Sequence, residues 1–427
     1  MVSRKKTIII GLVGMLILGF LWVWGRTMNL HPDPIKVGIL HSLSGFMAGS
    51  ESQLADATLM AIEEINRQGG LLGRPLQPVL ADGHSDWPTF AAQAEHLIRQ
   101  EQVKVIFGCY TSASRKTVKA VVEKYNHLLF YPVPYEGVEE SPNIVYNGAS
   151  PNQLYIPAVK WSLDHLGKKF FLVGSDYIWP RIANTIMKDA IFALRGEVVG
   201  EEYLLVGSTD VGKMIKKISE ARPDVILSTI VGNSNAAFYE GLNSAGFNSK
   251  KIPSMAFAVS EVELAQLDPE KLAGNYSCWS YFQSVDSPVN RAFVQRFKDR
   301  FGPKRVTNDS IEAGYFGLYL WAQAVKEANS TDVREVRRFL ADQSLEAPGG
   351  MVYIDGDTQH TWKTVRIAKI NQKGQFDIVW TSGKPVRPVP YPIYRSKSAW
   401  NLMIDEFYKA WGESWANPGV KKTDGRS

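Results

Sequence analysis

The side chains best suited to chemistry lie in the stretch 108–116, which reads GCYTSASRK. It joins an apolar segment, 103–107, expected as a buried strand, to a helix expected to open near Ala113. The first backbone N–H groups of a helix have no intrahelical partner and lie at the positive end of its dipole, so a carbonyl or carboxylate oxygen can bind there. Ser112 and Ser114 are also suited to cap the helix, with or without a ligand. Both interpretations stay open at this point.

Several aromatic residues lie close to predicted strand ends, where they are not expected to belong to the hydrophobic core. They are Tyr110, Tyr131, Tyr135, Tyr177 and Trp179. Because all five lie at the same ends of the strands, they suggest a small pocket with apolar walls. Its hydroxyl and indole groups would hydrogen-bond a compact polar ligand. The alternative is a set of aromatic contacts between two lobes that needs no ligand.

Catalytic and metal-binding motifs are absent from the sequence. The seven histidines are scattered, and no H-E-x-x-H, C-x-x-C, G-x-x-x-x-G-K-[ST] or G-x-S-x-G motif occurs. Cys109 has no histidine or carboxylate at a predictable distance to activate its thiol. We therefore expect a protein that is not an enzyme and that uses no metal and no cofactor.

The composition of the chain limits the possible folds and functions further. With 427 residues, 45% of them hydrophobic, the chain is long enough for two domains with cores of their own. Its net charge of +5 arises mainly from four basic residues near the N-terminus, so the folded body has no basic stripe for nucleic acid. The two cysteines, Cys109 and Cys278, fall in different predicted lobes, which favours free thiols over a disulfide framework.

An uncharged segment, 7–25, follows the basic residues 4–6. At about 1.5 Å per residue, a helix of this length crosses most of a ~30 Å hydrocarbon layer. The basic flank favours residues 1–6 in the cytoplasm and the remainder of the chain outside. Cleavage needs small residues and lipidation needs a cysteine, yet the first alanine is Ala48 and the first cysteine is Cys109. We expect an uncleaved helical anchor in the inner (cytoplasmic) membrane and a linker over 26–34, with a cleaved signal or a lipoprotein signal as alternatives.

From residue 35 onwards, predicted strands alternate with amphipathic helices. The first round has strands over 35–41, 76–82, 103–107 and 128–131, and helices over 53–68, 89–100 and 113–125. The second round has helices over 153–166, 181–194, 211–221 and 235–245, and strands over 170–174, 198–205, 225–229 and 254–258. This order predicts an α/β protein of two doubly wound parallel-sheet lobes with a cleft between them.

In open parallel sheets, ligands bind beyond the carboxyl ends of the strands. The loops expected at this edge are 42–52, 108–114 and 132–141 in the first lobe, and 174–180 and 229–233 in the second. Ile230, in the last of these loops, is a candidate ligand contact. A ligand that touches both lobes stabilises their closed form.

The apolar pattern breaks near 276–282. After it, helices are expected over 289–301, 309–328 and 332–341, and strands over 365–371 and 376–380. The pattern does not say which lobe these elements join. The tail, 386–427, carries tryptophans among charges, which favours a helix packed on the body over a helix on the membrane surface.

Several of these motifs resemble those of one known family. They are GCYTSASRK at 108–116, FYPVPYEG at 130–137, SPNIVY at 141–146, PNQ at 151–153 and GSDYIWPR at 174–181, and further matches occur at 286–288, 364–367 and 375–380. Over roughly residues 35–395 the chain is similar to the urea and short-chain amide binding proteins, which are type I periplasmic binding proteins of the branched-chain amino-acid ABC transporter class. A cytoplasmic amide sensor that restrains an antiterminator shares most of the motifs.

The resemblance implies ligand contacts at the matching positions. These are Tyr110 and Ser112 in the first motif, Tyr131 in the second, and Tyr177 and Trp179 in the last. Two positions depart from the family pattern: Val133 replaces a threonine of the amide sensor and removes a hydroxyl, and Trp179 replaces the usual tyrosine. The resemblance also implies that 35–148 and 279–347 form lobe 1, and that 149–278 and 348–385 form lobe 2.

The function implied is that of an extracytoplasmic solute-binding protein, which binds urea or a short-chain aliphatic amide and delivers it to the permease of an ABC importer. A neutral amide needs N–H or O–H groups on one side and oxygen acceptors on the other. A charged amino acid needs a buried counter-charge as well, and Asp176 and Glu136 can supply one. Amino acids therefore stay an alternative ligand class. A receptor that reports its ligand to a membrane signalling partner stays an alternative function.

Overall fold

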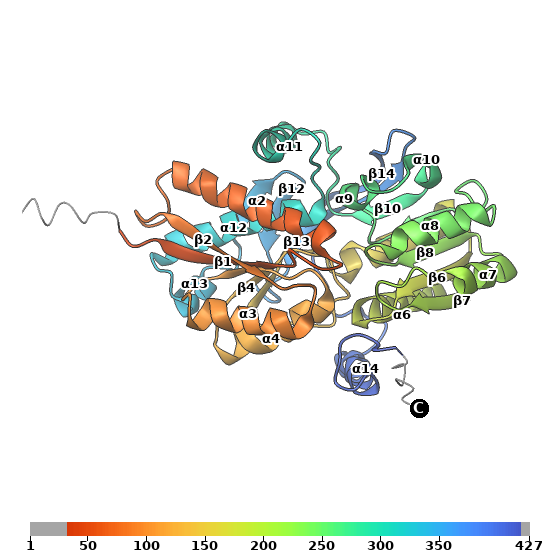
Figure 1. Cartoon of the computed structure of the whole chain (residues 1–427), viewed down its shortest axis with the longest axis horizontal. Coiled ribbons are helices and arrows are strands. Elements are labelled where there is room, and N and C mark those ends of the chain that lie inside the picture. Colours follow the sequence, from red (N-terminus) through yellow and green to blue (C-terminus); the bar gives the residue numbers. More distant parts are fainter. Residues whose placement is uncertain (1–31, 420–427) are drawn as a thin grey trace, which may run out of the picture.

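The computed structural model describes residues 32–419. The predicted cytoplasmic segment 1–6, the predicted anchor 7–25 and most of the predicted linker lie outside the described residues. Within 32–419, no helix combines the length and the apolar character needed to cross a membrane. The described chain forms two lobes that lie side by side along the long axis (Figure 1).

The first lobe is built on a five-stranded parallel sheet with the order β2-β1-β3-β4-β5. Its strands are β1 (Ile35–His41), β2 (Leu76–Asp82), β3 (Ile106–Gly108), β4 (Leu129–Tyr131) and β5 (Ile144–Tyr146). Helices α3 (Trp87–Arg99) and α4 (Ser112–Lys124) pack together on one face, and α2 (Ala48–Arg67) packs with α12 (Asp309–Ala328) on the other (Figure 1). Because helices cover both faces, every residue of β3, β4 and β5 is buried.

Two later helices complete this lobe. Helix α11 (Pro288–Phe301) packs against α2, and α13 (Val333–Arg338) packs against α12. The long helix α12 begins at the N-cap Asn308, whose side chain accepts a hydrogen bond from the Ile311 N–H. It ends at Asn329, a left-handed residue with φ of 47°.

The second lobe is built on a nine-stranded sheet with the order β11-β12-β13-β10-β9-β8-β6-β7, and β14 also pairs with β13. Five of its strands are β6 (Lys169–Ser175), β7 (Glu197–Leu204), β8 (Val225–Thr229), β9 (Ser254–Ala256) and β10 (Tyr276–Trp279), which are mutually parallel. The other four are β11 (Ser344–Ala347), β12 (Gly350–Ile354), β13 (Thr361–Ile370) and β14 (Phe376–Val386). These four join the sheet through antiparallel pairs.

The predicted parallel sheet of the second lobe is thus present in β6–β10, and the four later strands extend it with antiparallel pairs. Parallel neighbours need a crossover of a dozen or more residues. Only residues 348–349 separate β11 from β12, and only residues 371–375 separate β13 from β14. Connections this short produce hairpins, and Gly374 turns the second of them with a φ of 68°.

Helices cover this sheet as well. They are α5 (Tyr155–His165), α6 (Ile178–Ala193), α7 (Gly212–Ala221), α8 (Ser234–Ser244) and the short α9 (Glu261–Leu264) and α10 (Pro269–Leu272). The tail forms α14 (Lys397–Ala410), which packs on α6 and fully buries Trp400 (Figure 1). Separate hydrophobic clusters fill the two faces of the sheet.

Candidate functional site

The turn between β3 and α4 is shaped by two residues at the end of the strand. A Cβ on Gly108 would lie 2.2 Å from the Leu40 carbonyl oxygen, so only glycine fits against the neighbouring strand. Cys109 follows with a φ of 66° and donates its N–H to the same carbonyl at 2.9 Å. This turn directs Tyr110 and Ser112 away from the sheet edge towards the second lobe.

The helix cap of α4 is Thr111, because its Oγ1 accepts the Ser114 N–H at 3.1 Å. The expectation that Ser112 or Ser114 caps the helix is wrong. Ser112 is the first residue inside the helix. Its hydroxyl is therefore available for other partners.

A small cavity lies between the two lobes, at the carboxyl ends of their parallel strands. The volume left free between its side chains is about 20 Å³. Its walls include Tyr110, Ser112, Tyr131, Val133 and Pro134 from the first lobe and Tyr177, Trp179, Val231, Phe257, Ala258 and Trp279 from the second. The structure therefore brings six of the seven predicted site residues together around one space.

Ile230 is the exception. It is fully buried in the hydrophobic cluster on the opposite face of the second sheet, and its neighbour Val231 lines the cavity instead. Side chains alternate between the faces of a strand, and β8 continues this alternation past its end. Ile226 and Ile230 share one face while Leu227 and Val231 share the other.

Tyr135 also lies elsewhere than expected. Its ring stacks on Tyr146, with centroids 5.1 Å apart, and on His360. Its hydroxyl is hydrogen-bonded to His360 Nε2 and also lies 3.2 Å from the Glu139 carbonyl oxygen. Tyr135 therefore supports the wall from behind, in the core of the first lobe.

Phe257 and Trp279 are cavity residues that the sequence did not reveal. Phe257 directly follows β9, and Trp279 is the last residue of β10. Both obey the rule that ligands bind at strand ends. The sequence does not predict Trp279 as a cavity residue, because the apolar pattern breaks at β10 and does not indicate a strand there.

Three polar groups of the cavity walls have defined partners. Tyr131 Oη donates to the Tyr110 carbonyl oxygen at 2.7 Å. Trp179 Nε1 donates to Tyr155 Oη at 2.6 Å. The Ser112 hydroxyl is hydrogen-bonded to a Glu136 carboxylate oxygen.

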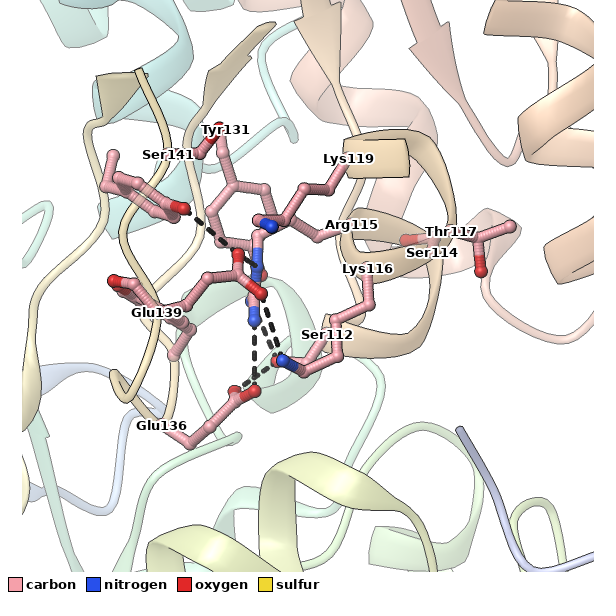
Figure 2. Close-up of polar contacts among 12 residues, drawn as sticks. Ser112, Ser114, Arg115, Lys116, Thr117, Lys119, Tyr131, Glu136, Glu139 and Ser141 are labelled. Atoms are coloured by element: carbon pink, nitrogen blue, oxygen red, sulfur yellow. Dashed lines mark hydrogen bonds and ion pairs between the residues drawn. The ribbon is translucent and has the colours of Figure 1, made fainter. Parts of the chain in front are cut away.

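A buried ionic cluster stands directly behind Ser112 (Figure 2). Arg115 donates from Nη2 to Glu136 at 2.9 Å and from Nε to Glu139 at 2.9 Å, and Lys116 donates to the second oxygen of Glu139 at 2.9 Å. Arg115 also donates from Nη1 to Ser112 Oγ at 3.0 Å. Two carboxylates and two cations thus neutralise one another out of contact with water.

Charge pairing outweighs burial in this cluster. Burial opposes the charged form of Arg115, but Glu139 and Glu136 hold its pKa well above the usual value. Burial alone would raise the pKa of the Glu139 carboxyl, whereas Arg115 and Lys116 hold it far below its usual range. Removing one member would leave a buried charge without its partner, which is strongly destabilising.

Side-chain hydrogen bonds join the lobes beside the cavity. Ser50 Oγ on α2 donates to Glu263 Oε1 on α9 at 2.9 Å. Asn308 Nδ2 donates to Ser260 Oγ at 2.8 Å. These two hydrogen bonds link α2 and the N-cap of α12 to the segment that carries α9.

The C-terminal segment reaches the same region. Asn417 donates its backbone N–H to the Asp176 carbonyl oxygen at 3.0 Å and its side-chain N–H to Asp176 Oδ2 at 2.6 Å. Arg181 donates to the other oxygen of this carboxylate at 2.7 Å. Asp176 is thereby paired, and the loop that carries Tyr177 is held in place.

Neither cysteine is placed for chemistry. Cys109 and Cys278 are both buried and unpaired with each other, and burial raises the pKa of the Cys109 thiol, which keeps it in the unreactive protonated form. Among residues 32–419, no three histidine, cysteine or carboxylate side chains are arranged to hold a metal ion.

Comparisons with known proteins agree with this architecture. The Leu/Ile/Val-binding protein homolog 6 of Brucella suis is 23% identical over 359 residues, which cover 80% of this chain and 88% of that protein. The solute binding protein of an ABC transporter from Rhodopseudomonas palustris HaA2, solved in complex with p-hydroxybenzoic acid, has the same fold, with a TM-score of 0.75 and 22% identity over 83% of this chain and 98% of that one.

A shorter likeness is confined to one part of the chain. A stretch of 118 residues, 28% of this chain, is 39% identical to part of a protein named limonene hydroxylase from Geobacillus stearothermophilus. The match spans only 22% of that protein's length.

The family is shown by a match to most of the described chain. The family model described as "Periplasmic binding protein domain" matches residues 35–397, which include both sheets and every wall of the cavity. The chain belongs to the periplasmic binding protein family.

Proposed function

We propose that this chain is the extracytoplasmic solute-binding component of an ABC importer and that its ligand is urea or a short aliphatic amide. The observation that carries this proposal is the cavity between the lobes. It is small, it is enclosed by both lobes, and polar groups interrupt its aromatic walls. A ligand held there contacts both lobes and stabilises the closed form.

The size of the cavity favours a very small ligand. Sites for drug-sized molecules commonly measure about 300–1,000 Å³, whereas the volume left free between the side chains of this one is only about 20 Å³. Tyr131, Tyr177, Trp179 and Trp279 take up much of the space. A hydroxybenzoate or a leucine side chain would need these walls to move further than urea, formamide or acetamide would.

The charges around the cavity favour a neutral ligand. The two acidic residues that could serve an amino acid's ammonium group, Glu136 and Asp176, are each paired with an arginine. A zwitterion would therefore lack a free buried counter-charge. Val133, in place of a hydroxyl-bearing residue, leaves one part of the wall apolar.

A thermal-shift screen of the purified protein tests this proposal. A ligand that binds only the folded state raises its stability by RT ln(1 + [L]/Kd). We expect urea, formamide or acetamide to raise the unfolding temperature, and leucine and 4-hydroxybenzoate at the same concentrations to have no effect. A shift with leucine or 4-hydroxybenzoate alone, or with no compound, would contradict the proposal.

We also propose that the segment 7–25 anchors the protein in the cytoplasmic membrane and that the lobes face outwards. The support is the uncharged run behind a basic flank. Sequencing the N-terminus of the membrane-bound protein checks this proposal, because a mature chain that begins near residue 30 would show cleavage instead.

A further inference from the structure

The proton of the Ser112 hydroxyl is committed to a fixed partner. Ser112 Oγ is hydrogen-bonded to Glu136 Oε2, and a carboxylate paired with a guanidinium can only accept. Ser112 must therefore donate to Glu136. Arg115 Nη1 donates to the same Ser112 oxygen at 3.0 Å. A hydroxyl has one proton and two lone pairs, so one lone pair is all that Ser112 has left for the cavity.

Tyr131 and the backbone at the start of α4 add groups of fixed polarity to this wall. Tyr131 uses its proton on the Tyr110 carbonyl, so its oxygen can only accept a further hydrogen bond. The backbone N–H groups of Ser112 and Ala113, in the first turn of α4, have no hydrogen-bond partner among residues 32–419 and can only donate. Ser112, which lines the cavity, thus has one free donor, its backbone N–H, and one free acceptor, its hydroxyl oxygen.

We propose that Glu136, acting through Ser112, makes the site select ligands that carry a hydrogen-bond donor beside an acceptor on one edge and reject carboxylates of the same shape. This inference rests on the proposed function, because it concerns the same cavity. One edge of a primary amide presents its carbonyl oxygen beside an N–H, which complements the N–H and the lone pair of Ser112. A carboxylate presents two acceptors, and one of them would face the Ser112 lone pair.

Glu136 is a positioning residue, because it does not line the cavity. Its second oxygen accepts from Arg115 Nη2 at 2.9 Å, and this contact fixes what a glutamine would do in its place. In the variant Glu136→Gln, the carbonyl oxygen of the new side-chain amide must face the arginine, so its N–H₂ group must face Ser112. Ser112 would then accept from both neighbours and turn its own proton into the cavity.

Glu139 offers a matched control within the same ionic cluster. It is a buried carboxylate that also pairs with Arg115, but its other partners are Lys116 and Tyr146. No hydrogen bond joins it to Ser112 in the described chain. Glu139→Gln therefore also removes one negative charge from the cluster while leaving the hydrogen-bond partners of Ser112 unchanged.

The test measures the affinities of the full chain for acetamide and acetate, two molecules of nearly the same shape, by calorimetry. We expect the unsubstituted protein to prefer acetamide by at least about 100-fold, because a site that hydrogen-bonds an N–H rejects an analogue without it. Glu136→Gln should lower this preference at least about tenfold, which corresponds to about 1.4 kcal/mol. Glu139→Gln should leave the preference unchanged, whatever its effect on stability.

A double-substitution cycle shows whether the effect passes through Ser112. In a chain that already carries Ser112→Ala, adding Glu136→Gln should not alter the preference any further. If Glu136→Gln does not fold, the variant Ser112→Ala tests the inference by itself. It removes the lone pair and should lower the preference for acetamide over acetate at least about tenfold.

The outcomes separate this inference from the proposed function. A folded Glu136→Gln variant that keeps the full preference overturns the inference, as does an equal loss in Glu139→Gln. An unsubstituted protein that binds acetamide and acetate equally overturns the inference alone. A protein that binds neither acetamide nor urea overturns the proposed function.

Discussion

The backbone carbonyl of Trp415 accepts a hydrogen bond from the Ile178 N–H at 3.0 Å, which ties the C-terminal segment to the first turn of α6. The same turn carries Trp179, and Tyr177 directly precedes the helix. The contact therefore positions two residues that line the cavity. The Trp415 ring also lies 5.0 Å from Lys116 Nζ, in the first lobe. The tail thus braces the binding site from both lobes.

A chain that ends after Trp411 should bind acetamide at least about threefold more weakly than the full chain, because the loop at Asp176 and Tyr177 would no longer be held in its binding conformation. Helix α14, which ends at Ala410, would be kept. Calorimetric titration measures the change. A chain that ends after Gly419 is the control and should bind like the full chain. Equal affinities for all three chains would show that the tail has no part in binding.

Most of the fold could be predicted where long apolar segments alternate with helical periodicity. The expected strands 35–41, 76–82 and 225–229 coincide with β1, β2 and β8. Failures occur where the signal is short. Strand β5 has three residues and β10 has four, too few to show a pattern of their own. Helix α2 begins at Ala48, five residues before the expected start. No side chain caps it, so the sequence has no capping residue to mark this start.

The candidate site could be predicted as far as loop positions go, but not in the direction of single side chains. The strand-end rule and the family motifs located six wall residues. Whether Ile230 or Val231 faces the cavity depends on how far the alternation of side chains continues past the end of β8. Which of Thr111, Ser112 and Ser114 caps α4 depends on the backbone angles at the turn. The ionic cluster was not foreseen, because Arg115, Glu136 and Glu139 meet only when α4 packs beside the loop after β4.

Thr111 and Ser112 should respond differently to removal of their hydroxyls. Thr111→Ala removes the N-cap of α4 and should lower the free energy of unfolding by about 0.5–2 kcal/mol, with little change in acetamide affinity. Ser112→Ala keeps the cap and removes a polar group from the cavity wall, so it should weaken acetamide binding. Chemical unfolding and calorimetry on both variants measure the two effects. The reverse pattern would assign the site's serine a purely structural role.

The side chain at position 179 should set the largest ligand that the cavity accepts. Trp179→Tyr shortens a wall residue and removes the N–H that Tyr155 Oη accepts. We expect the ratio of butyramide to urea affinity to rise at least about threefold, because one methylene in an apolar pocket is worth roughly 1–3 kcal/mol. Trp161→Tyr is the control, since Trp161 lies in the same lobe and stacks on His165 away from the cavity. A ratio that rises equally in both variants would refute this assignment.

Glu51 should make the stability of the protein depend on pH. Burial is the main cause that raises the pKa of its carboxyl from 4.5 to about 8. One oxygen accepts the Ser42 N–H at 2.6 Å, and the other has no partner among residues 32–419. A protonated carboxyl suits such a site better than a charged one. Burial likewise raises the pKa of the Glu261 carboxyl to about 8.

Between pH 4.5 and about 8, the folded state keeps a proton on Glu51 that the unfolded state has released, so the contribution of Glu51 to the free energy of unfolding falls as pH rises through this range. Glu51→Gln is neutral throughout and should flatten this dependence, so that the variant gains stability relative to the unsubstituted protein between about pH 5 and pH 8. Thermal unfolding across this range, without ligand, measures the difference. Part of the slope should persist in the variant because Glu261 contributes in the same direction. A Glu51→Gln variant with an unchanged slope would mean that Glu51 is charged in the folded protein and that its burial is relieved in solution.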